Sequence, residues 1–244
     1  SLACNYNTEA NMADGSCTYA EEGYDCEGNI QTSLSFDGVD DYVKIDTLLS
    51  HSFEKFTIST NIKLRNYDNE GRIISFGNDN QIVLMITNNN YSPSAIRYII
   101  NDDEFDYHID STFYDLWHNI SVTFDGQNMK LYIDYVKVEE LNTNTIIDTV
   151  GLRDGIYIGK RYPNNDPEYL NCLIDDVIIL DRELLDNEFQ QLSCEYSEMD
   201  INVIANWNFN EAGGNTVYDL SGNENHGIIN GASYSTDTPD NNCE

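Results

Sequence analysis

Short runs of alternating apolar and polar residues constrain this chain more than any other feature. The clearest runs span residues 56–64, 72–76, 81–87, 95–100, 117–124, 129–138, 155–159 and 172–180. A period of two is typical of strands that bury one face, and polar turns such as Asp-Gly and Asn-Asp fall between the runs. The spacing predicts an all-β fold, in which two antiparallel sheets form a sandwich.

The stretch Ser33–Val43 is a strand followed by an acidic hinge. Leu34 and Phe36 alternate with serines, the chain turns at Asp37-Gly38, and a second strand begins at Tyr42. The hinge also carries Asp40 and Asp41. Three carboxylates at such a turn form either a polar turn or one wall of a cation site.

One segment has helical spacing. Leu184, Leu185, Phe189 and Leu192 recur on one face of the sequence from Arg182 to Leu192. The pattern predicts one short helix after the last of the strands.

The charge is extreme, with 43 acidic against 12 basic residues and a formal net charge of −31. Such a surface repels phosphate, so neither nucleic acid nor an anionic membrane is expected as a partner. It suits a protein adapted to salty water, and it also suits divalent cations, which prefer carboxylate oxygens. We expect both to hold.

Six cysteines without a C-x-x-C motif indicate disulfides and therefore a secreted protein. Residues 1–29 form a Cys-rich lead-in with little to bury, so we predict a Cys4–Cys17 disulfide there. Cys194 and Cys243 lie on either side of the last segment and form a second predicted pair. This leaves Cys26 to pair with Cys172. Six cysteines allow fifteen connectivities in all. With no signal peptide and no apolar run long enough to insert into a membrane, we interpret the chain as a mature product or a fragment.

Several motifs occur in an order that resembles a known family. They are S-L-S-F-D-G-V-D-D-Y-V, F-T-I-S-T-N-I-K-L, G-R-I-I-S-F-G, W-H-N-I-S-V-T-F-D-G, M-K-L-Y-I-D, I-Y-I-G-K and C-L-I-D-D-V-I-I-L-D-R-E-L. Over residues 30–194 the chain resembles the laminin-G-like and concanavalin-A-like jelly-roll domains, in the branch shared with pentraxins. The lead-in resembles a short A-C-N-Y…D-G-S-C repeat of modular secreted proteins. We therefore expect a jelly-roll domain at residues 30–244, preceded by a small disulfide-bonded segment at residues 1–29.

The segment 203–231 is similar to the part that usually opens such a domain, yet here it follows the body. Either the chain is circularly permuted and residues 200–235 complete the sandwich, or a second copy begins there. We favour the first, because too few residues follow for another domain.

The resemblance also implies a calcium ion (Ca²⁺). In the family, the D-x-S-G-N loop, the F-D-G-x-D-D turn and the I-D-D strand come together around calcium. Matched residue by residue, this gives the candidate ligands Asp219, Asn223, Asn225, Asp175 and Asp40. The alternative is that these residues form Asx turns and a capped strand end.

No catalytic motif is found, so we predict that the chain is not an enzyme. The E-x-D-x-E strand of related β-glucan hydrolases, with its paired glutamates, does not occur. Nor does a G-x-S-x-G, H-E-x-x-H or P-loop motif.

Tyrosine-bearing loops rich in Asn and Asp suit a glycan, because tyrosine rings stack on sugars and amides bind hydroxyls. The most distinctive loop supplies the candidate ligand-binding residues Arg161, Tyr162, Asn164, Asn165 and Tyr169. We predict an extracellular, calcium-stabilised module that binds a carbohydrate or a surface glycoprotein. The alternative is a structural subunit of an extracellular filament, sheath or surface layer, whose partners would be identical copies.

Overall fold

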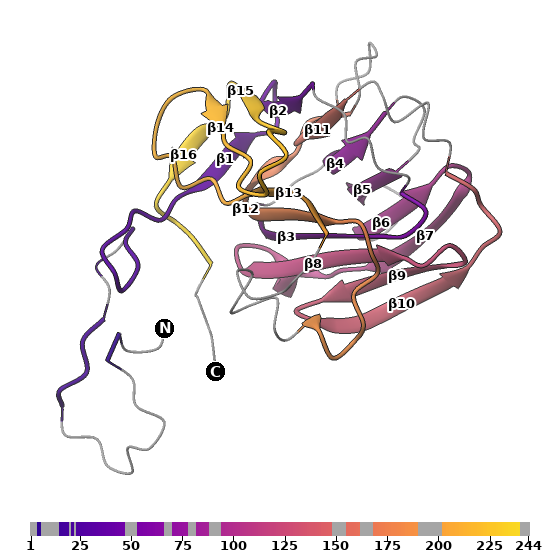
Figure 1. The fold of residues 1–244 in the computed structure, drawn as a ribbon, viewed down its shortest axis with the longest axis horizontal. Coiled ribbons are helices and arrows are strands. Elements are labelled where there is room, and N and C mark those ends of the chain that lie inside the picture. Colours follow the sequence, from indigo (N-terminus) through magenta and orange to yellow (C-terminus); the bar gives the residue numbers. More distant parts are fainter. Residues whose placement is uncertain are drawn as a thin grey trace.

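The protein is a sandwich of two eight-stranded antiparallel sheets (Figure 1). This computed structural model describes residues 4–5, 15–19, 21, 23–46, 53–65, 70–77, 82–87, 94–147, 155–161, 168–189 and 202–239. No helix among them is long and apolar enough to cross a bilayer. The predicted all-β sandwich is confirmed.

Sheet 1 has the order β10-β9-β8-β3-β12-β1-β16, and β13 pairs with the second half of β12. Its strands are β1 (Ser33–Asp37), β3 (Phe56–Leu64), β8 (Trp117–Phe124), β9 (Asn128–Ile133), β10 (Val136–Asn142), β12 (Asn171–Leu180), β13 (Val203–Trp207) and β16 (Ser233–Ser235). The long strand β12 exchanges its partner β1 for β13 at a bulge after Asp175.

Sheet 2 has the order β14-β15-β2-β11-β4-β5-β6-β7. Its strands are β2 (Tyr42–Ile45), β4 (Gly71–Phe76), β5 (Ile82–Thr87), β6 (Ala95–Ile100), β7 (Asp103–His108), β11 (Ile156–Ile158), β14 (Thr216–Val217) and β15 (Gly227–Asn230). The turn that joins β1 to β2 therefore carries the chain from one sheet to the other.

The core lies between the sheets and follows the alternation of the sequence. In β3, Phe56, Ile58, Ile62 and Leu64 are buried in the main apolar cluster, while the odd-numbered side chains between them face the other side of the sheet. Burial of this kind stabilises a fold by roughly 25 cal/mol per Å² of apolar surface.

The structure corrects two strand predictions. The run 129–138 is a hairpin, because Asp134 (φ 49°) and Tyr135 (φ 66°) turn the chain between β9 and β10. Tyrosine is an unusual residue for a left-handed turn position. β7 was not predicted, since its sequence D-E-F-D-Y-H reads as a polar loop, and it pairs along its whole length with β6.

The helix predicted over 182–192 does not begin at Arg182. Residues 181–188 are irregular or turn, Phe189 is the first in a helical conformation, and 190–201 lie outside the described residues. Leu184 and Phe189 instead pack on Tyr132, Ile178 and Leu180 and cover part of the outer face of sheet 1. One 3-10 turn, η1 (Ser111–Phe113), precedes β8.

The last strands join both sheets around the first two. β16 pairs with β1, β13 pairs with β12, and β15 pairs with β2 while carrying β14 at its other edge. Strands from residues 203–235 therefore flank β1 in sheet 1 and β2 in sheet 2.

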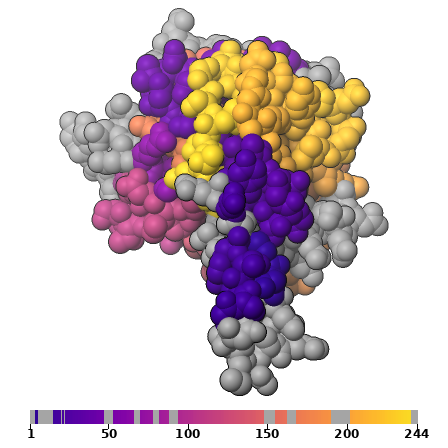
Figure 2. All heavy atoms as spheres, turned by 90° about the vertical axis from the view of Figure 1, so that its left-hand side faces the viewer, coloured from indigo at the N-terminus to yellow at the C-terminus, as the bar shows by residue number. Residues whose placement is uncertain are grey.

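The N-terminal segment projects from the sandwich next to the C-terminal residues (Figure 2). A disulfide joins Cys4 to Cys26. Cys17 is a free, exposed thiol, and Cys172 is a free thiol buried in the core, so the predicted pairs Cys4–Cys17 and Cys26–Cys172 are wrong. Cys172 faces inward from β12, out of reach of the projecting segment. The predicted Cys194–Cys243 pair lies outside the described residues.

Candidate binding face and acidic turn

The turn between β1 and β2 gathers three carboxylates. Asp37, Asp40 and Asp41 each offer an oxygen, and these atoms all lie within 4.8 Å of one another. The Asp37 N–H donates to Asp41 Oδ2 at 2.8 Å, and the Val39 N–H donates to Asp37 Oδ1 at 2.7 Å. These two bonds hold the turn in shape.

Asp41 is the buried member of the group and is 7% exposed. Burial raises the pKa of its carboxyl group, the hydrogen bond from Asp37 opposes this rise, and the nearby charges of Asp37 and Asp40 add to it. A cation at this turn would relieve the same repulsion.

Two further loops pack against the turn. A Cβ atom on Gly231 (φ +81°) would overlap Asp41 Oδ1, and one on Gly159 (φ +84°) would lie 3.3 Å from the Asp41 carbonyl oxygen. Glycine is therefore needed at 231 by the Asp41 carboxylate, and at 159 by the ring of Phe36, which a Cβ atom would approach to 2.6 Å. Three segments far apart in sequence meet at Asp41.

A neighbouring acceptor is unsatisfied. Asn171 lies opposite Asp37 in the β1–β12 ladder. Its Oδ1 atom is buried and has no hydrogen-bond partner among the described residues. Buried polar atoms are normally paired, so this oxygen marks the rim beside the acidic turn as a place where a ligand atom could be accommodated.

Tyrosines and a lysine share the outer face of sheet 2 next to this turn. Tyr42 follows Asp41, and its ring centroid lies 6.1 Å from that of Tyr157. Lys160 Nζ lies 4.3 Å from the Tyr42 centroid and 5.3 Å from the Tyr169 centroid. We call Tyr42, Tyr157, Lys160 and Tyr169 the tyrosine–lysine face.

An ion-pair chain adjoins the tyrosine–lysine face. Arg72 Nε donates to Glu168 Oε2 at 2.7 Å, and Arg161 donates to Glu168 Oε1 at 2.6 Å. Arg72 is 3% exposed, and burial lowers the pKa of its guanidinium while the charge of Glu168 raises it. The start and the end of the loop between β11 and β12 are thereby fixed to β4.

Comparison with known families decides the relationship. A laminin G family model, described as the concanavalin A-like lectin/glucanases superfamily, matches residues 37–190. That span covers more than half of the 244 residues. The chain belongs to this superfamily.

Solved structures of other superfamily-like sandwiches share the fold at low identity. A candidate carbohydrate binding protein from Bacteroides ovatus has a TM-score of 0.69 at 13% identity, over 87% of this chain and 62% of its own. The heptameric SAP-like pentraxin of Limulus polyphemus has a TM-score of 0.53 at 15% identity, over 65% of this chain and 80% of its own. The binding domain of Paraclostridial Mosquitocidal Protein 1 has a TM-score of 0.51 at 16% identity, over 66% of this chain and 42% of its own. No curated protein sequence matches.

The five residues predicted to share calcium in this concanavalin A-like domain do not come together. Asp40 belongs to the acidic turn, while no other described acidic group of three could hold a metal. Asp40 lies near the end of β15, because Asn230 pairs with Tyr42, and Asn225 precedes its start. The five-residue step from Asn225 to Asn230 corresponds to about 16 Å of strand.

Asp219 serves another purpose. Its carboxylate accepts hydrogen bonds from the N–H groups of Asn206, Ser221 and Asn225 and from the Ser221 hydroxyl, at 2.7–3.0 Å. The Asn223 and Asn225 amides donate to backbone carbonyls at 203 and 204. The D-x-S-G-N loop is thus an Asx-type clamp on β13, as the alternative interpretation had it.

Asp175 sits at the bulge of β12 and is 5% exposed. Burial raises the pKa of Asp175 and of its neighbour Asp176, and the charge of Asp176 raises that of Asp175 further. The Asp175 carboxylate accepts a hydrogen bond from the Asp176 N–H, and Asn61 donates to Asp176.

Of the predicted ligand-binding residues, Arg161 and Tyr169 lie together at the tyrosine–lysine face, and Tyr162, Asn164 and Asn165 lie outside the described residues. Sequence reasoning missed Tyr42 and Lys160. The alternation of Tyr42 with buried Val43 already indicates an outward side chain. Its contact with Lys160 follows from the pairing of β2 with β11, which the local pattern does not contain.

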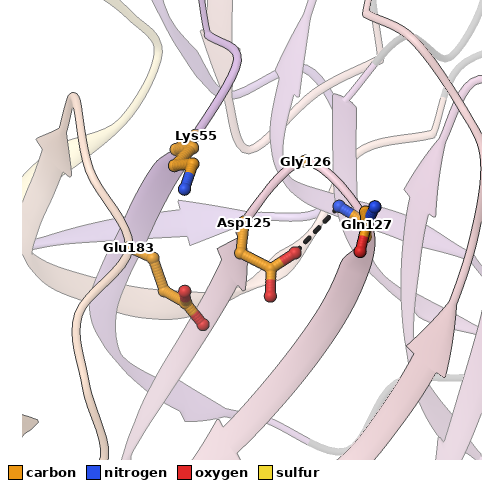
Figure 3. A pocket seen from close by; sticks show the side chains of 5 residues that line it. All are labelled: Lys55, Asp125, Gly126, Gln127 and Glu183. Carbon is orange, nitrogen blue, oxygen red and sulfur yellow. Dashed lines mark hydrogen bonds between the residues drawn. The ribbon is translucent and has the colours of Figure 1, made fainter.

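A separate open hollow of about 510 Å³ lies at the ends of the sheet 1 strands, lined by Lys55, Asp125, Gly126, Gln127 and Glu183 (Figure 3). The Gln127 N–H donates to Asp125, and Lys130 pairs with both Asp125 and Glu183. Its carboxylates are thus already bound by protein groups, and Lys55 makes no ion pair with a described carboxylate.

Proposed function

We propose that this domain is an extracellular carbohydrate-binding module whose sugar site is the tyrosine–lysine face. The observation that carries the proposal is the contact of Lys160 with the rings of Tyr42 and Tyr169 on the outer face of sheet 2, where Tyr157 packs against Tyr42. Tyrosine rings stack on the apolar faces of sugars, and their hydroxyls bind sugar hydroxyls. Membership of a lectin superfamily supports the same role.

The carboxylate at this face favours binding over hydrolysis. Glycoside hydrolysis needs a pair of carboxyl groups that donate a proton and attack or activate water. Both oxygens of Glu168 are bound by arginines, so this group is engaged in structure.

The acidic turn is the calcium site of the proposal. Calcium prefers carboxylate and carbonyl oxygens, and Asp37, Asp40 and Asp41 supply carboxylates within 4.8 Å of one another. The raised pKa of Asp41 and the Asn171 oxygen, which has no hydrogen-bond partner within the described part of the chain, support a cation there. Because Tyr42 follows Asp41 directly, the ion would hold the edge of the sugar site.

The Cys4–Cys26 disulfide supports an extracellular location. A surface glycoprotein is also a ligand under this proposal, provided that the domain binds its glycan.

A glycan array with three variants tests the proposal. Tyr42→Ala and Tyr169→Ala should each weaken binding of the best glycan about fivefold or more, since truncation of a stacked aromatic ring costs ~1–3 kcal/mol. Tyr19→Ala, which removes a tyrosine 60% exposed on the N-terminal segment, is the matched control and should bind as the wild type does.

Absence of any glycan signal, together with self-assembly at millimolar calcium, would overturn the proposal in favour of a structural subunit. Equal losses in all three variants would show that the signal comes from elsewhere on the surface.

A further inference from the structure

Lys160 stands out among the described basic residues of this strongly acidic protein. The chain carries 43 acidic residues for 12 basic ones, so most basic side chains find a carboxylate. Lys160 makes no ion pair with a described carboxylate, although the backbone of Asp41 contacts the neighbouring Gly159. Its ammonium group contacts two tyrosine rings instead.

The neighbouring charges do not cancel it. Arg72 and Arg161 share the single carboxylate of Glu168, and Glu70 also acts on Arg72. These four groups balance one another, so the positive charge of Lys160 remains. Lys160 and these four groups together carry one positive charge, in a molecule whose net charge is −31, and the carboxylates of the acidic turn lie beside them.

We propose that the tyrosine–lysine face selects an anionic glycan, with Lys160 as the counter-ion of a sugar carboxylate or sulfate. This rests on the proposed function and adds the class of sugar. Tyr42 and Tyr169 would stack on the ring, while the ammonium group between them binds the acidic substituent. Arg161, partly exposed and bound to one oxygen of Glu168, lies close enough in sequence to add a second donor.

The rest of the surface strengthens the selection. Acidic groups elsewhere repel an anionic polymer over about a Debye length. An anionic glycan would therefore bind beside Lys160, where the electrostatic potential is less negative. The acidic surface elsewhere would repel it. A neutral sugar would have no such preference.

The competing explanation is that Lys160 only holds the two tyrosines in position. The variant Lys160→Gln separates the two roles, because glutamine keeps much of the length and hydrogen-bonding capacity but not the charge. Loss of a positioning residue would weaken neutral and acidic glycans alike, whereas loss of a counter-ion weakens the acidic one.

The experiment compares three oligosaccharides of one backbone, carrying a carboxylate, a sulfate or neither, by calorimetry in millimolar calcium. For wild type we expect the two acidic forms to bind about tenfold more tightly than the neutral form, with an advantage that shrinks as salt is added. Lys160→Gln should abolish the advantage and leave neutral binding unchanged, and Lys160→Arg should retain it. Lys55→Gln is the matched control, because it removes another lysine that pairs with no described carboxylate, at the hollow of Figure 3.

Equal affinity for the three sugars, or an equal loss in Lys55→Gln, would overturn the inference and leave the proposed function standing. Failure of every sugar to bind would instead overturn the proposed function. A difference between the carboxylated and sulfated forms identifies the group that Lys160 prefers.

Discussion

Asp219 shows how one carboxylate can hold a loop through hydrogen bonds. Its two oxygens accept four hydrogen bonds and attach residues 221–225 to β13. Ionised acceptors form stronger hydrogen bonds than neutral ones, and the donors left behind on truncation are costly when buried. Asp219 is 7% exposed, so those donors would have little access to water.

Asp219→Ala should therefore destabilise the protein by about 3 kcal/mol, equally in calcium and in a chelator. Urea unfolding of wild type and variant under both conditions measures this. A loss confined to the calcium condition would restore Asp219 as a metal ligand and contradict the hydrogen-bonded clamp.

At the scale of the element, β12 carries the bulge that directs its two halves to different partners. Asp176 has φ +49°, and the register shifts between Asp175 and Ile178. Two adjacent carboxyl groups are buried at this irregular point. Since their pKa values are raised on folding, the folded state binds protons more tightly than the unfolded chain. Their contribution to stability is present below the usual carboxyl pKa and is lost as pH rises through the folded-state values.

Asp175→Asn, which mimics the protonated acid and keeps the acceptor for the Asp176 N–H, should raise stability by about 1–2 kcal/mol at neutral pH. The gain should vanish in acid, where wild type is protonated. Urea midpoints from acidic to neutral pH provide the measurement. A variant less stable than wild type at neutral pH would mean that the charge of Asp175 is compensated by a partner such as a cation.

The strands show what the sequence could predict at this scale. Period-two alternation located β3, β6 and β8 to the residue, because alternate residues of each strand face the main core. It could not locate β7, whose stability comes from pairing with β6 rather than from its polar sequence. The helix predicted over 182–192 was wrong for residues 182–188, where Leu184 covers sheet 1 from an irregular segment, whereas Phe189 is helical and residues 190–192 lie outside the described residues.

The site was predictable only in part. Asp40 and Arg161 were found because acidic turns and distinctive loops are visible locally. The expected convergence of Asp40 with Asp175 and Asp219 failed because strand order decides which loops meet. In the structure Asp41 meets Gly159 and Gly231, and no local pattern marks those glycines as its neighbours.

At the scale of the whole molecule, the excess of 31 negative charges makes stability depend on ions in two ways. Any salt screens the general self-repulsion. Calcium at the acidic turn would add a specific term, because a ligand that binds only the native state stabilises it by mass action.

Calcium at about ten times its dissociation constant should stabilise the protein by about 1.4 kcal/mol beyond sodium chloride of matched ionic strength. Asp40→Asn should remove this increment, whereas Asp102→Asn, an equal charge change at an exposed position on the β6–β7 turn, should preserve it. Thermal unfolding with calcium titration measures both. An equal calcium response in the two variants would assign the effect to screening alone.

The placement of β15 and β16 beside β2 and β1 also affects how the protein is made. A ribosome delivers β1 and β2 early, yet their outer neighbours emerge only after residue 235 has been added. During that interval both strands present open backbone edges, which are templates for association with other chains. Synthesis of this protein thus includes a vulnerable period whose length is set by the translation of some two hundred intervening residues, and a chaperone that shields strand edges would act in that window.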